Sequence, residues 1–387
     1  MKVCLFANTL SYPEGGGHLW VYLNWALGLR SVGCQVTWLE DTAPSIRRRM
    51  PPHEVQRLVA ALKARLARHD LADSVALCSS SPEPLPQDAV EGCLDLEAAA
   101  EADLLLDLNY ARHTEIVGRF RRSALVDIDP GLSQIWMSAE GAEHGLRQIA
   151  PHDVYFTTGE TVGQPGARFP DCGLKWQYIP PVVYLPEWPV TAAEPHAPFT
   201  TVTHWRTQWL WYEGEYRLND KRLTFLEYSD LPGLTNAHLE LAVFLTRDDA
   251  HDDFEDQRLL EQKGWKIRPS WEVSRTPEAY RTYIQQSKGE FSCAKPSCML
   301  LQNAWISDRT LCYLASGKPA VVQHTGASRF LPDAEGLFRF RTLEEAARAL
   351  SAAESDCEQH GRLARALAEE YFDAQKVVGR VLERALA

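Results

Sequence analysis

Residues 307–340 read SDRTLCYLASGKPAVVQHTGASRFLPDAEGLFRF, and this stretch decides the fold. Its polar opening, Ser307 to Thr310, precedes a helical run that a Gly-Lys-Pro break ends at residues 317–319. A short apolar strand and a loop containing Thr325 and Gly326 follow. In this order of helix start, glycine stop, strand and glycine loop, an α/β domain presents backbone N–H groups to a phosphate. We interpret the stretch as half of a nucleotide-sugar site.

The composition is that of an acidic globular protein. The 387 residues are 45% hydrophobic and 24% charged, with a formal net charge of −12. This length suits two domains of roughly 150 to 200 residues. The negative charge argues against a general nucleic-acid binder, because such binding depends on a basic surface. A local basic pocket for one diphosphate is still compatible with it.

The first residues and the cysteines indicate a cytoplasmic protein. Residues 1–7 read MKVCLFA, which predicts a first strand and not a signal peptide. No apolar run in the sequence has the length that a membrane helix needs. The nine cysteines include no Cys-x-x-Cys pair, which predicts reduced thiols with no zinc site and no disulfide framework.

Several motifs of this chain match a known group of enzymes. Residues 307–326 contain Ser-Asp-Arg-Thr, Tyr-Leu-Ala-Ser-Gly-Lys-Pro and Gln-x-Thr-Gly, and residues 331–337 read Leu-Pro-x-x-x-Gly-Leu. In these motifs the chain resembles bacterial glycosyltransferases of the GT-B architecture. The likeness extends through residues 288–292 and back to 15–20, so it covers nearly the whole chain. It implies an α/β fold with two Rossmann-like parallel-sheet domains facing across a cleft.

The order of predicted elements divides the chain into four parts. Residues 1–180 begin with a βαβ pattern and form an N-terminal Rossmann-like domain, which the resemblance makes the acceptor domain. Prolines are dense from 181 to 198, which is typical of a stiff linker. Residues 199–365 form the C-terminal Rossmann-like donor domain. The last part, residues 366–387, is a helix that in the resembled architecture crosses back to the first domain.

Individual elements follow from periodicity, caps and turn residues. Strands are predicted at 2–7, 35–39, 103–108, 124–128, 154–157, 199–203, 239–245 and 265–267. Helices are predicted at 18–32, 53–70, 276–287, 344–350 and 361–386.

The helix that begins near Asp308 carries the first candidate group. Ser307 or Asp308 can cap it, and Arg309 can pair with phosphate oxygens in fork geometry. The alternative is a plain cap followed by a surface arginine. The resemblance places Arg309 and Thr310 near a nucleotide diphosphate and the loop at 325–326 near nucleotide or sugar. Many retaining relatives have a glutamate where this chain has Cys312, so binding of ribose by a glutamate is not expected here.

The loop Glu14-Gly15-Gly16-Gly17-His18 is the second group. The glycines can let the backbone approach a ligand and adopt positive φ, at the positive end of a helix. In inverting relatives a histidine of this first loop is the general base, so His18 is the candidate. A histidine that only caps or packs at the helix start is the alternative.

The third group is Asp127-Ile128-Asp129-Pro130-Gly131, after a predicted strand. If the strand persists, both carboxylates project on the same face. Asp129 is then a second base candidate, an orienting partner for His18, or a ligand for acceptor hydroxyls. Ordinary turn chemistry before Pro-Gly explains the same residues equally well.

Cations and aromatic residues complete the candidates. Arg206 and Lys221 can offset charge on a diphosphate leaving group, or can be solvated surface charges. Glu290 and Lys295 come from a loop before the key helix and are placed near sugar hydroxyls by position. The cluster Trp205, Trp209, Trp211 and Tyr212 is compatible with a sugar or aromatic ligand and with an ordinary core.

These observations predict a glycosyltransferase that moves a sugar from a nucleoside diphosphate to a small-molecule or glycan acceptor. We expect this reaction to be metal-independent and to use no cofactor. No nucleic-acid or integral-membrane partner is expected, and a homodimer is allowed. The alternatives are a sugar-nucleotide epimerase, a phosphorylase, for which no pyridoxal-phosphate motif is found, and a silent homologue that only binds. Nucleotide, sugar, acceptor and stereochemistry are left open.

Overall fold

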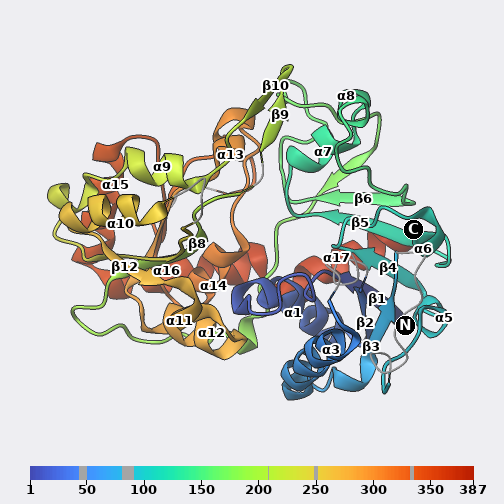
Figure 1. Ribbon diagram of the computed structural model, residues 1–387. Coiled ribbons are helices and arrows are strands. Elements are labelled where there is room, and N and C mark those ends of the chain that lie inside the picture. The colour runs from blue at the N-terminus through green and yellow to red at the C-terminus, as the bar shows by residue number, and fades with distance from the viewer. Residues whose placement is uncertain (43–49, 81–90, 208, 248–251, 332–334) are drawn as a thin grey trace. The chain divides into compact units, whose positions relative to one another are not determined.

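A computed structural model describes residues 1–42, 50–80, 91–207, 209–247, 252–331 and 335–387 (Figure 1). The chain forms two compact units. Unit 1 contains Met1–Thr158, Pro170–Tyr184 and Ala374–Ala387, and unit 2 contains Gly159–Phe169 and Leu185–Asp373. Part of the motif at 331–337 lies outside the described residues.

Unit 1 is built on a parallel sheet of seven strands in the order β3-β2-β1-β4-β5-β6-β7. The strands are β1 (Lys2–Ala7), β2 (Gln35–Asp41), β3 (Val75–Cys78), β4 (Leu104–Asp107), β5 (Ser123–Asp127), β6 (Val154–Thr157) and β7 (Trp176–Tyr178). Every residue of β3, β4, β5 and β6 is buried. Such continuous burial is typical of parallel strands that helices cover on both faces.

Helices and turns join these strands. The helices of unit 1 are α1 (Gly16–Ser31), α3 (Pro52–Leu66), α5 (Leu96–Ala100), α6 (Thr114–Val117), α7 (Leu132–Met137), α8 (Ala139–Glu143) and α17 (Ala374–Leu386). Short 3₁₀ turns follow α3 at Ala67–His69 and Ala72–Ser74. The predicted helix at 53–70 therefore ends as an α-helix at Leu66. The predicted βαβ start is present as β1, α1 and β2.

Unit 2 repeats this architecture with six parallel strands in the order β12-β11-β8-β13-β14-β15. They are β8 (Phe199–His204), β11 (Leu239–Phe244), β12 (Lys266–Pro269), β13 (Gly289–Ser292), β14 (Ala320–Gln323) and β15 (Leu337–Phe340). A separate antiparallel hairpin, β9 (Leu210–Tyr212) and β10 (Glu215–Arg217), is inserted after β8. Aromatic side chains such as Trp205, Phe225 and Phe291 fill the core.

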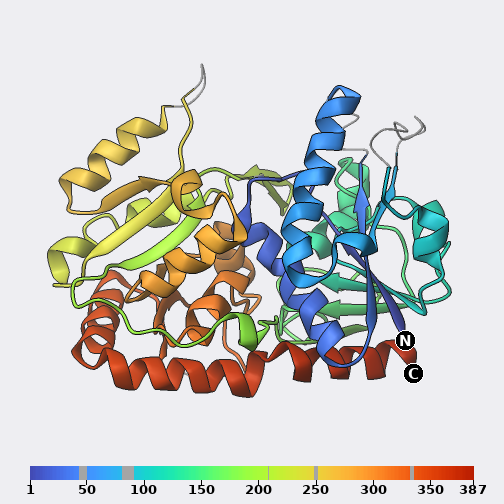
Figure 2. The same ribbon diagram turned by 90° about the horizontal axis from the view of Figure 1, so that it is seen from below.

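The helices of unit 2 flank its sheet (Figures 1 and 2). They are α9 (Lys221–Glu227), α10 (Asp253–Gln262), α11 (Ser270–Ser274), α12 (Pro277–Gln286), α13 (Pro296–Leu301), α14 (Asp308–Ala315), α15 (Leu343–Ser355) and α16 (Cys357–Leu367), with 3₁₀ turns at Leu185–Glu187 and Leu231–Leu234. Thr276 caps α12 and Pro277 occupies its first turn, as the sequence predicts. No helix of the described residues has both the length and the apolar character that crossing a bilayer requires.

The last helix differs from the prediction. The periodicity of residues 361–386 predicts one helix, but α16 ends at Leu367 and a π-helical turn covers Ala368–Phe372. Asp373 then takes an extended ψ of 116°, and α17 begins at Ala374. The backbone N–H of Ala374 donates to the carbonyl of Val183, which stabilises the break. The break separates α17 from α16, and α17 packs against α1 within unit 1 (Figure 2).

Candidate functional site

The first loop of unit 1 is fixed by a buried carboxylate. Glu40, at the end of β2, is 1% exposed and accepts hydrogen bonds from the backbone N–H groups of Thr9 at 2.9 Å and Leu10 at 3.2 Å. The indole Nε1 of Trp38 donates to it at 2.9 Å, and burial raises the pKa of Glu40. Sequence reasoning missed Glu40. In the sequence Glu40 directly follows the apolar residues Trp38 and Leu39, just beyond the predicted end of the strand at residue 39, and nothing else marks it.

The glycines of this loop matter because they lack side chains, and not because their backbone dihedral angles are unusual. Gly15 has a φ of −89°, and Gly16 and Gly17 lie inside α1. The prediction of positive φ is therefore wrong, because the helix begins earlier than residue 18. A Cβ atom at Gly15 would lie 2.2 Å from the ring of Tyr12, so a side chain there would displace this ring. Gly15 also provides no side-chain cap for the N-terminus of α1.

His18 is held in one tautomer by the backbone. Its Nε2 lies 2.7 Å from the carbonyl oxygen of Asn8, and the rings of Tyr12 and Tyr22 pack edge-on at 5.8 and 5.2 Å. Because a carbonyl can only accept, Nε2 carries the proton and the lone pair of the neutral ring is on Nδ1. Burial lowers the pKa of His18, while the Asn8 hydrogen bond and the charge of Asp129 act in the opposite direction. His18 is therefore neutral at pH 7 with Nδ1 as its basic atom.

The two aspartates after β5 have different surroundings. The strand ends at Asp127, so the condition under which both carboxylates would share a strand face is not met. Asp127 is fully buried, and burial raises its pKa. It accepts hydrogen bonds from Tyr110, Ser133, Gln134 and Thr157. Asp129 is only half-buried and lies close enough to His18 to raise the pKa of this ring.

Tyr110 fixes the Asp129 loop, a role that the sequence did not predict. Its Oη accepts hydrogen bonds from the backbone N–H groups of Ile128 and Asp129, both at 2.8 Å, and donates to Asp127 at 3.1 Å. The structure therefore places the charge of Asp129 near His18, whereas the carboxylate of Asp127 is buried and fully engaged in hydrogen bonds.

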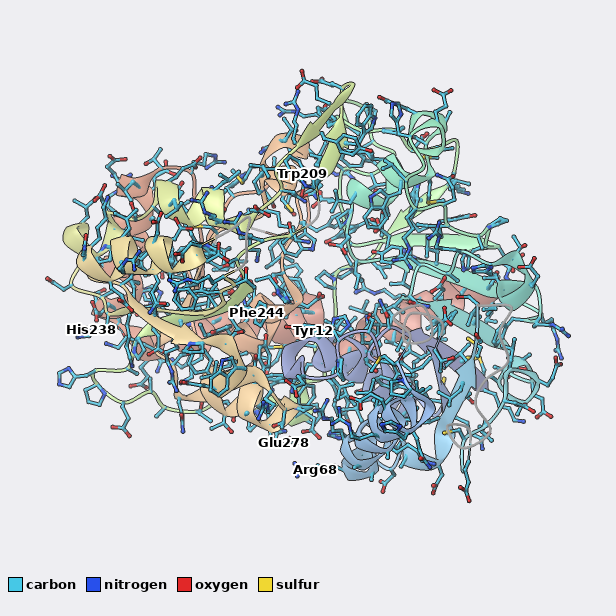
Figure 3. The ribbon with its side chains drawn as sticks, viewed as in Figure 1. Tyr12, Arg68, Trp209, His238, Phe244 and Glu278 are labelled. Carbon is cyan, nitrogen blue, oxygen red and sulfur yellow. The ribbon has the colours of Figure 1, made fainter. Side chains whose placement is uncertain are left out.

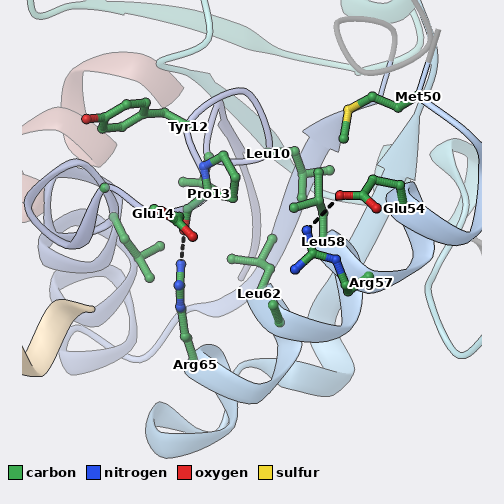
Figure 4. A pocket seen from close by; sticks show the side chains of 14 residues that line it. Leu10, Tyr12, Pro13, Glu14, Met50, Glu54, Arg57, Leu58, Leu62 and Arg65 are labelled. Carbon is green, nitrogen blue, oxygen red and sulfur yellow. Dashed lines mark hydrogen bonds and ion pairs between the residues drawn. The ribbon is translucent and has the colours of Figure 1, made fainter. Parts of the chain in front are cut away.

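An apolar pocket of about 250 Å³ lies beside the glycine loop, between this loop and α3 (Figure 4). Leu10, Leu58 and Leu62 provide apolar walls. Polar side chains of Glu54, Arg57 and Arg65 also line it. Arg65 donates a hydrogen bond to the carbonyl of Pro13, and Arg57 pairs with Glu54 at 2.7 Å. The pocket has room for a ring-sized ligand next to the residues that support His18.

In unit 2, Arg309 faces inward from α14. Ser307 caps this helix by accepting from the backbone N–H of Arg309 at 3.3 Å. The guanidinium donates to Glu290 at 2.6 Å, to the carbonyl of Val202 at 3.1 Å and to the hydroxyl of Ser292 at 2.5 Å. Glu290 is fully buried, with Oε1 bound to Arg309 and no hydrogen-bond partner for Oε2 among the described residues, so a sugar hydroxyl would have to reach Oε2 inside the core. Both residues were predicted at the donor site, and the structure joins them to each other.

Lys221, the first residue of α9, is a buried cation. It is 7% exposed, and no hydrogen bond is made at its Nζ within the described part of the chain. Burial and, after it, the nearby positive charges of Arg309 and Lys295 together lower its pKa to about 7. Three cations thus converge at the ends of β8 and β13, where open parallel sheets bind ligands.

The predicted residues around α14 line one small hollow. Its walls include Ser292, Ser307, Arg309, Thr310, Gln323 and Thr325. The volume of about 20 Å³ has room for one water molecule. The hollow is therefore too small to enclose a nucleotide. Among these residues Thr310 is itself 1% exposed, so its side chain supports the helix.

The Thr325-Gly326 loop needs glycine for a steric reason. Gly326 has a φ of +136°, and a Cβ atom there would lie 2.7 Å from the carbonyl oxygen of Gln302. The hydroxyl of Thr325 donates to the carbonyl of Trp305 at 2.6 Å. These contacts fix the loop at the carboxyl end of β14, close to the hollow that Thr325 lines.

Arg206 and the tryptophans are not brought together with Lys221 as one group. Arg206 pairs with Asp253 at 2.7 Å and with Asp220 at 3.8 Å. Trp205 is 1% exposed and donates to Asp256, so it belongs to the core. Trp209 and Trp211 belong to the inserted hairpin instead. The described residues contain no group of three or more histidine, cysteine, aspartate or glutamate side chains arranged to hold a metal ion.

No family model and no curated protein matches this chain. Solved structures do match along its full length. One is an α-glucosyltransferase in complex with UDP-glucose and DNA containing an abasic site, with a TM-score of 0.56 and 9% identity over 100% of both chains. AviGT4, a glycosyltransferase involved in avilamycin A biosynthesis, has a TM-score of 0.53 and 14% identity over 100% of this chain and 97% of its own.

Sucrose-phosphate synthase from Thermosynechococcus elongatus matches with a TM-score of 0.54 and 11% identity over 100% of this chain and 99% of its own. Identities this low show the fold and nothing finer. The fold is α/β of the GT-B class, with two Rossmann-like parallel-sheet domains, as the sequence predicts.

Proposed function

We propose that the protein is a glycosyltransferase that moves a sugar from a nucleoside diphosphate to an acceptor hydroxyl without a metal ion. The proteins of similar fold support the class of reaction, because they are glycosyltransferases and a sucrose-phosphate synthase, and one was solved with UDP-glucose. The observation that carries the proposal is the buried ammonium group of Lys221 beside two further cations.

A buried ammonium group without a partner costs several kcal/mol unless an anion offsets it. After burial, the largest influences on the pKa of Lys221 are the two positive charges of Arg309 and Lys295, and the opposing contributions of Cys298 and Glu290 are smaller. A diphosphate supplies both the negative charge and the hydrogen-bond acceptors that Lys221 lacks. The cations would also offset the charge that develops on the leaving diphosphate, the part that a metal ion takes in other transferases.

His18 supplies the base if the reaction inverts the sugar. Its Nδ1 carries a lone pair at pH 7, and Asp129 stabilises the imidazolium that forms when it takes the acceptor proton. If the reaction retains configuration, His18 and Asp129 bind donor or acceptor groups instead.

Calorimetric titration with UDP tests the donor site, with dTDP, GDP and ADP as further nucleotides and EDTA in a parallel series. Lys221→Met should weaken UDP binding roughly 10- to 100-fold, the value of a hydrogen bond to a charged group. Replacement of an unpartnered buried cation by an apolar side chain of similar size should leave the fold intact. Lys263→Met is the matched control, since Lys263 pairs with Asp230 on the surface of the same unit. EDTA should change nothing.

The pH dependence of UDP affinity gives a second readout. The free Lys221 has a pKa of about 7, and a bound diphosphate must raise this pKa. Below pH 7 the lysine is already charged, so affinity is flat. Above pH 7 binding takes up a proton, about half a proton at pH 7 and about 0.9 at pH 8, and affinity falls with pH. Lys221→Met should abolish the uptake.

Failure of every nucleotide to bind would contradict the proposal, as would UDP binding that Lys221→Met leaves unchanged. Arg309→Ala is a poorer test because it leaves the carboxylate of Glu290 buried without its cation, so loss of binding could reflect misfolding. If UDP binds but no acceptor is glycosylated, product analysis with and without acceptor separates an epimerase from a silent homologue.

A further inference from the structure

The inserted hairpin has two chemically different faces. Its register pairs Tyr216 with Trp211, and the ring centroids of this pair lie 4.7 Å apart. Side chains alternate along a strand, so the paired residues Trp211 and Tyr216 share one face, and Trp209 and Leu218 lie just beyond the strand ends, two residues from each of them. We call these four residues the aromatic face. Trp209 is 58% exposed, Tyr216 55% and Leu218 43%.

The opposite face attaches the hairpin, which follows β8 in Figure 1 and carries the labelled Trp209 at its base in Figure 3, to unit 2. Leu210 is 2% exposed, and the hydroxyl of Tyr212 donates to the carbonyl of Arg168 at 2.9 Å. An isolated two-stranded hairpin is marginally stable in water, so these contacts are what hold it in place. Trp209, Tyr216 and Leu218 are thereby presented to solvent on a supported hairpin, while Trp211 is half-buried.

The base of the hairpin adjoins the candidate donor site. The backbone N–H of Thr207 donates to Asp220 at 2.6 Å, and its hydroxyl donates to the carbonyl of Asn219 at 2.8 Å. These bonds close the two ends of the insertion. Lys221 is the next residue after Asp220, and Asn219 accepts from the backbone N–H of Ser297 at 2.8 Å. The aromatic face is therefore continuous with the elements that position the Lys221 cation.

We propose that the aromatic face is the acceptor subsite of the enzyme and that its ligand is a carbohydrate chain. This inference rests on the proposed glycosyltransferase function and names the acceptor class. The C–H face of a sugar ring stacks on flat indole and phenol rings while its hydroxyls stay in water, which suits an open surface. Glu213, in the turn between the strands, has a largely exposed side chain that can bond ring hydroxyls at the edge of this face, whereas Glu215 and Arg217 project from the opposite face.

Other occupants fit less well. Purely apolar small molecules are typically enclosed in concave pockets, whereas this face is open. A stable protein interface needs about 800 Å² per partner, more than four side chains supply. Segment 209–218 contains two glutamates and one arginine, so it does not attract anionic lipid or nucleic acid.

Indole NMR signals test the subsite directly. The full chain, labelled with ¹⁵N-tryptophan, is titrated with soluble hexasaccharides of glucose, mannose, galactose and N-acetylglucosamine. We expect at least one to shift the signals of Trp209 and Trp211, assigned through Trp209→Phe and Trp211→Phe. Trp271, 52% exposed in the same unit, should not respond.

Substitutions then separate the subsite from the donor site. Trp209→Ala and Tyr216→Ala should weaken oligosaccharide binding at least fivefold, and Trp271→Ala should leave it unchanged. UDP affinity should stay within twofold in all three variants. Oligosaccharides that shift neither hairpin indole would overturn the subsite even if UDP binds, whereas a wild-type chain that binds no nucleotide overturns the proposed function itself.

Two further results would replace the acceptor role with another. Self-association in sedimentation experiments that Trp209→Ala abolishes would make the aromatic face an interface between copies of this chain. Shifts of the hairpin indoles by single-stranded dT12 at physiological salt, without a response to sugars, would make it a nucleic-acid surface.

Discussion

Burial lowers the pKa of both His18 and Lys221, but the consequence for the proposed role differs between the two side chains. For His18 a lowered pKa keeps the ring neutral and able to accept a proton. For Lys221 it means that half of the molecules lack the positive charge near pH 7, until an anion binds. The base is therefore ready in the free protein, whereas the cation site is completed by its ligand.

The acid side of the pH–rate profile reports on His18. A general base is active when deprotonated, so kcat/KM should fall only below pH 6.5, because burial lowers the pKa of His18 from this value. Asp129 raises the same pKa, so Asp129→Asn should move the fall to lower pH. Steady-state measurements of kcat/KM from pH 4.5 to 8 give the pH at which this fall occurs in the wild type and in the variant.

Asparagine has nearly the same shape as aspartate, so Asp129→Asn should preserve the fold. A shift of the pH–rate profile can then be attributed to the lost charge. A fall that moves to higher pH in Asp129→Asn, or that persists in His18→Ala, would show that another group is the base.

At the scale of elements, α17 shows how a helix is positioned by the absence of a side chain. A Cβ atom at Gly28 of α1 would lie 2.9 Å from the Cβ of Ala374 and 3.2 Å from a methyl group of Val378. The two helices therefore approach closely at this point. The sequence pattern of α1 does not reveal this, because almost every residue from Leu19 to Leu29 is buried.

Gly28→Val should overpack the contact between α1 and α17. Extra methyl groups in a packed interior cost about 1–3 kcal/mol of unfolding free energy, and a β-branched residue brings little helix propensity to offset them. Gly379→Ala on α17 is the control, because nothing lies within 4 Å of its added methyl group. It should stabilise by about 0.5–1 kcal/mol.

Urea unfolding followed by circular dichroism compares the two variants with the wild type. A stability for Gly28→Val equal to that of the wild type would mean that α17 does not rest against α1 at this position.

At the scale of the whole molecule, the chain passes four times between its two units. The segments Gly159–Phe169, Pro170–Tyr184 and Ala374–Ala387 each belong to a different unit from the segment before them. Glu160 accepts hydrogen bonds from Ser328 and from the backbone N–H of Arg329, which attaches Gly159–Phe169 to the rest of unit 2. Each unit is therefore completed by residues distant in sequence.

Truncation after Asp373 removes the part of unit 1 that comes last in the chain. It exposes the face of α1 that Val377, Val378 and Val381 cover, so amide hydrogen exchange should rise in α1 and β1. Exchange in β13 and α14 of unit 2 should stay at the wild-type rate. Mass spectrometry of peptides from both units makes the comparison, and an equal rise in both would show that the units unfold as one.

Most of the fold was predictable from local patterns. Apolar runs such as residues 2–7 and 154–157 predict buried parallel strands, and the structure confirms their bounds. The helix caps were predictable too. The side chains of Thr276 and Ser307 accept hydrogen bonds from backbone N–H groups in the first turns of α12 and α14. The break at Asp373 was not predictable, because the residues around it have good helix periodicity and only the hydrogen bond to Val183 selects the interruption.

The sequence by itself determined the fold class, the caps and the loops that carry His18, Asp129 and Lys221, because periodicity and turn chemistry act over a few residues. Only the tertiary structure decided what these side chains do. It joined Arg309 to Glu290, oriented His18 through Asn8 and left Lys221 without a partner among the described residues. Hydrogen bonds and desolvation depend on groups far apart in the chain, and no local pattern records which of them will meet.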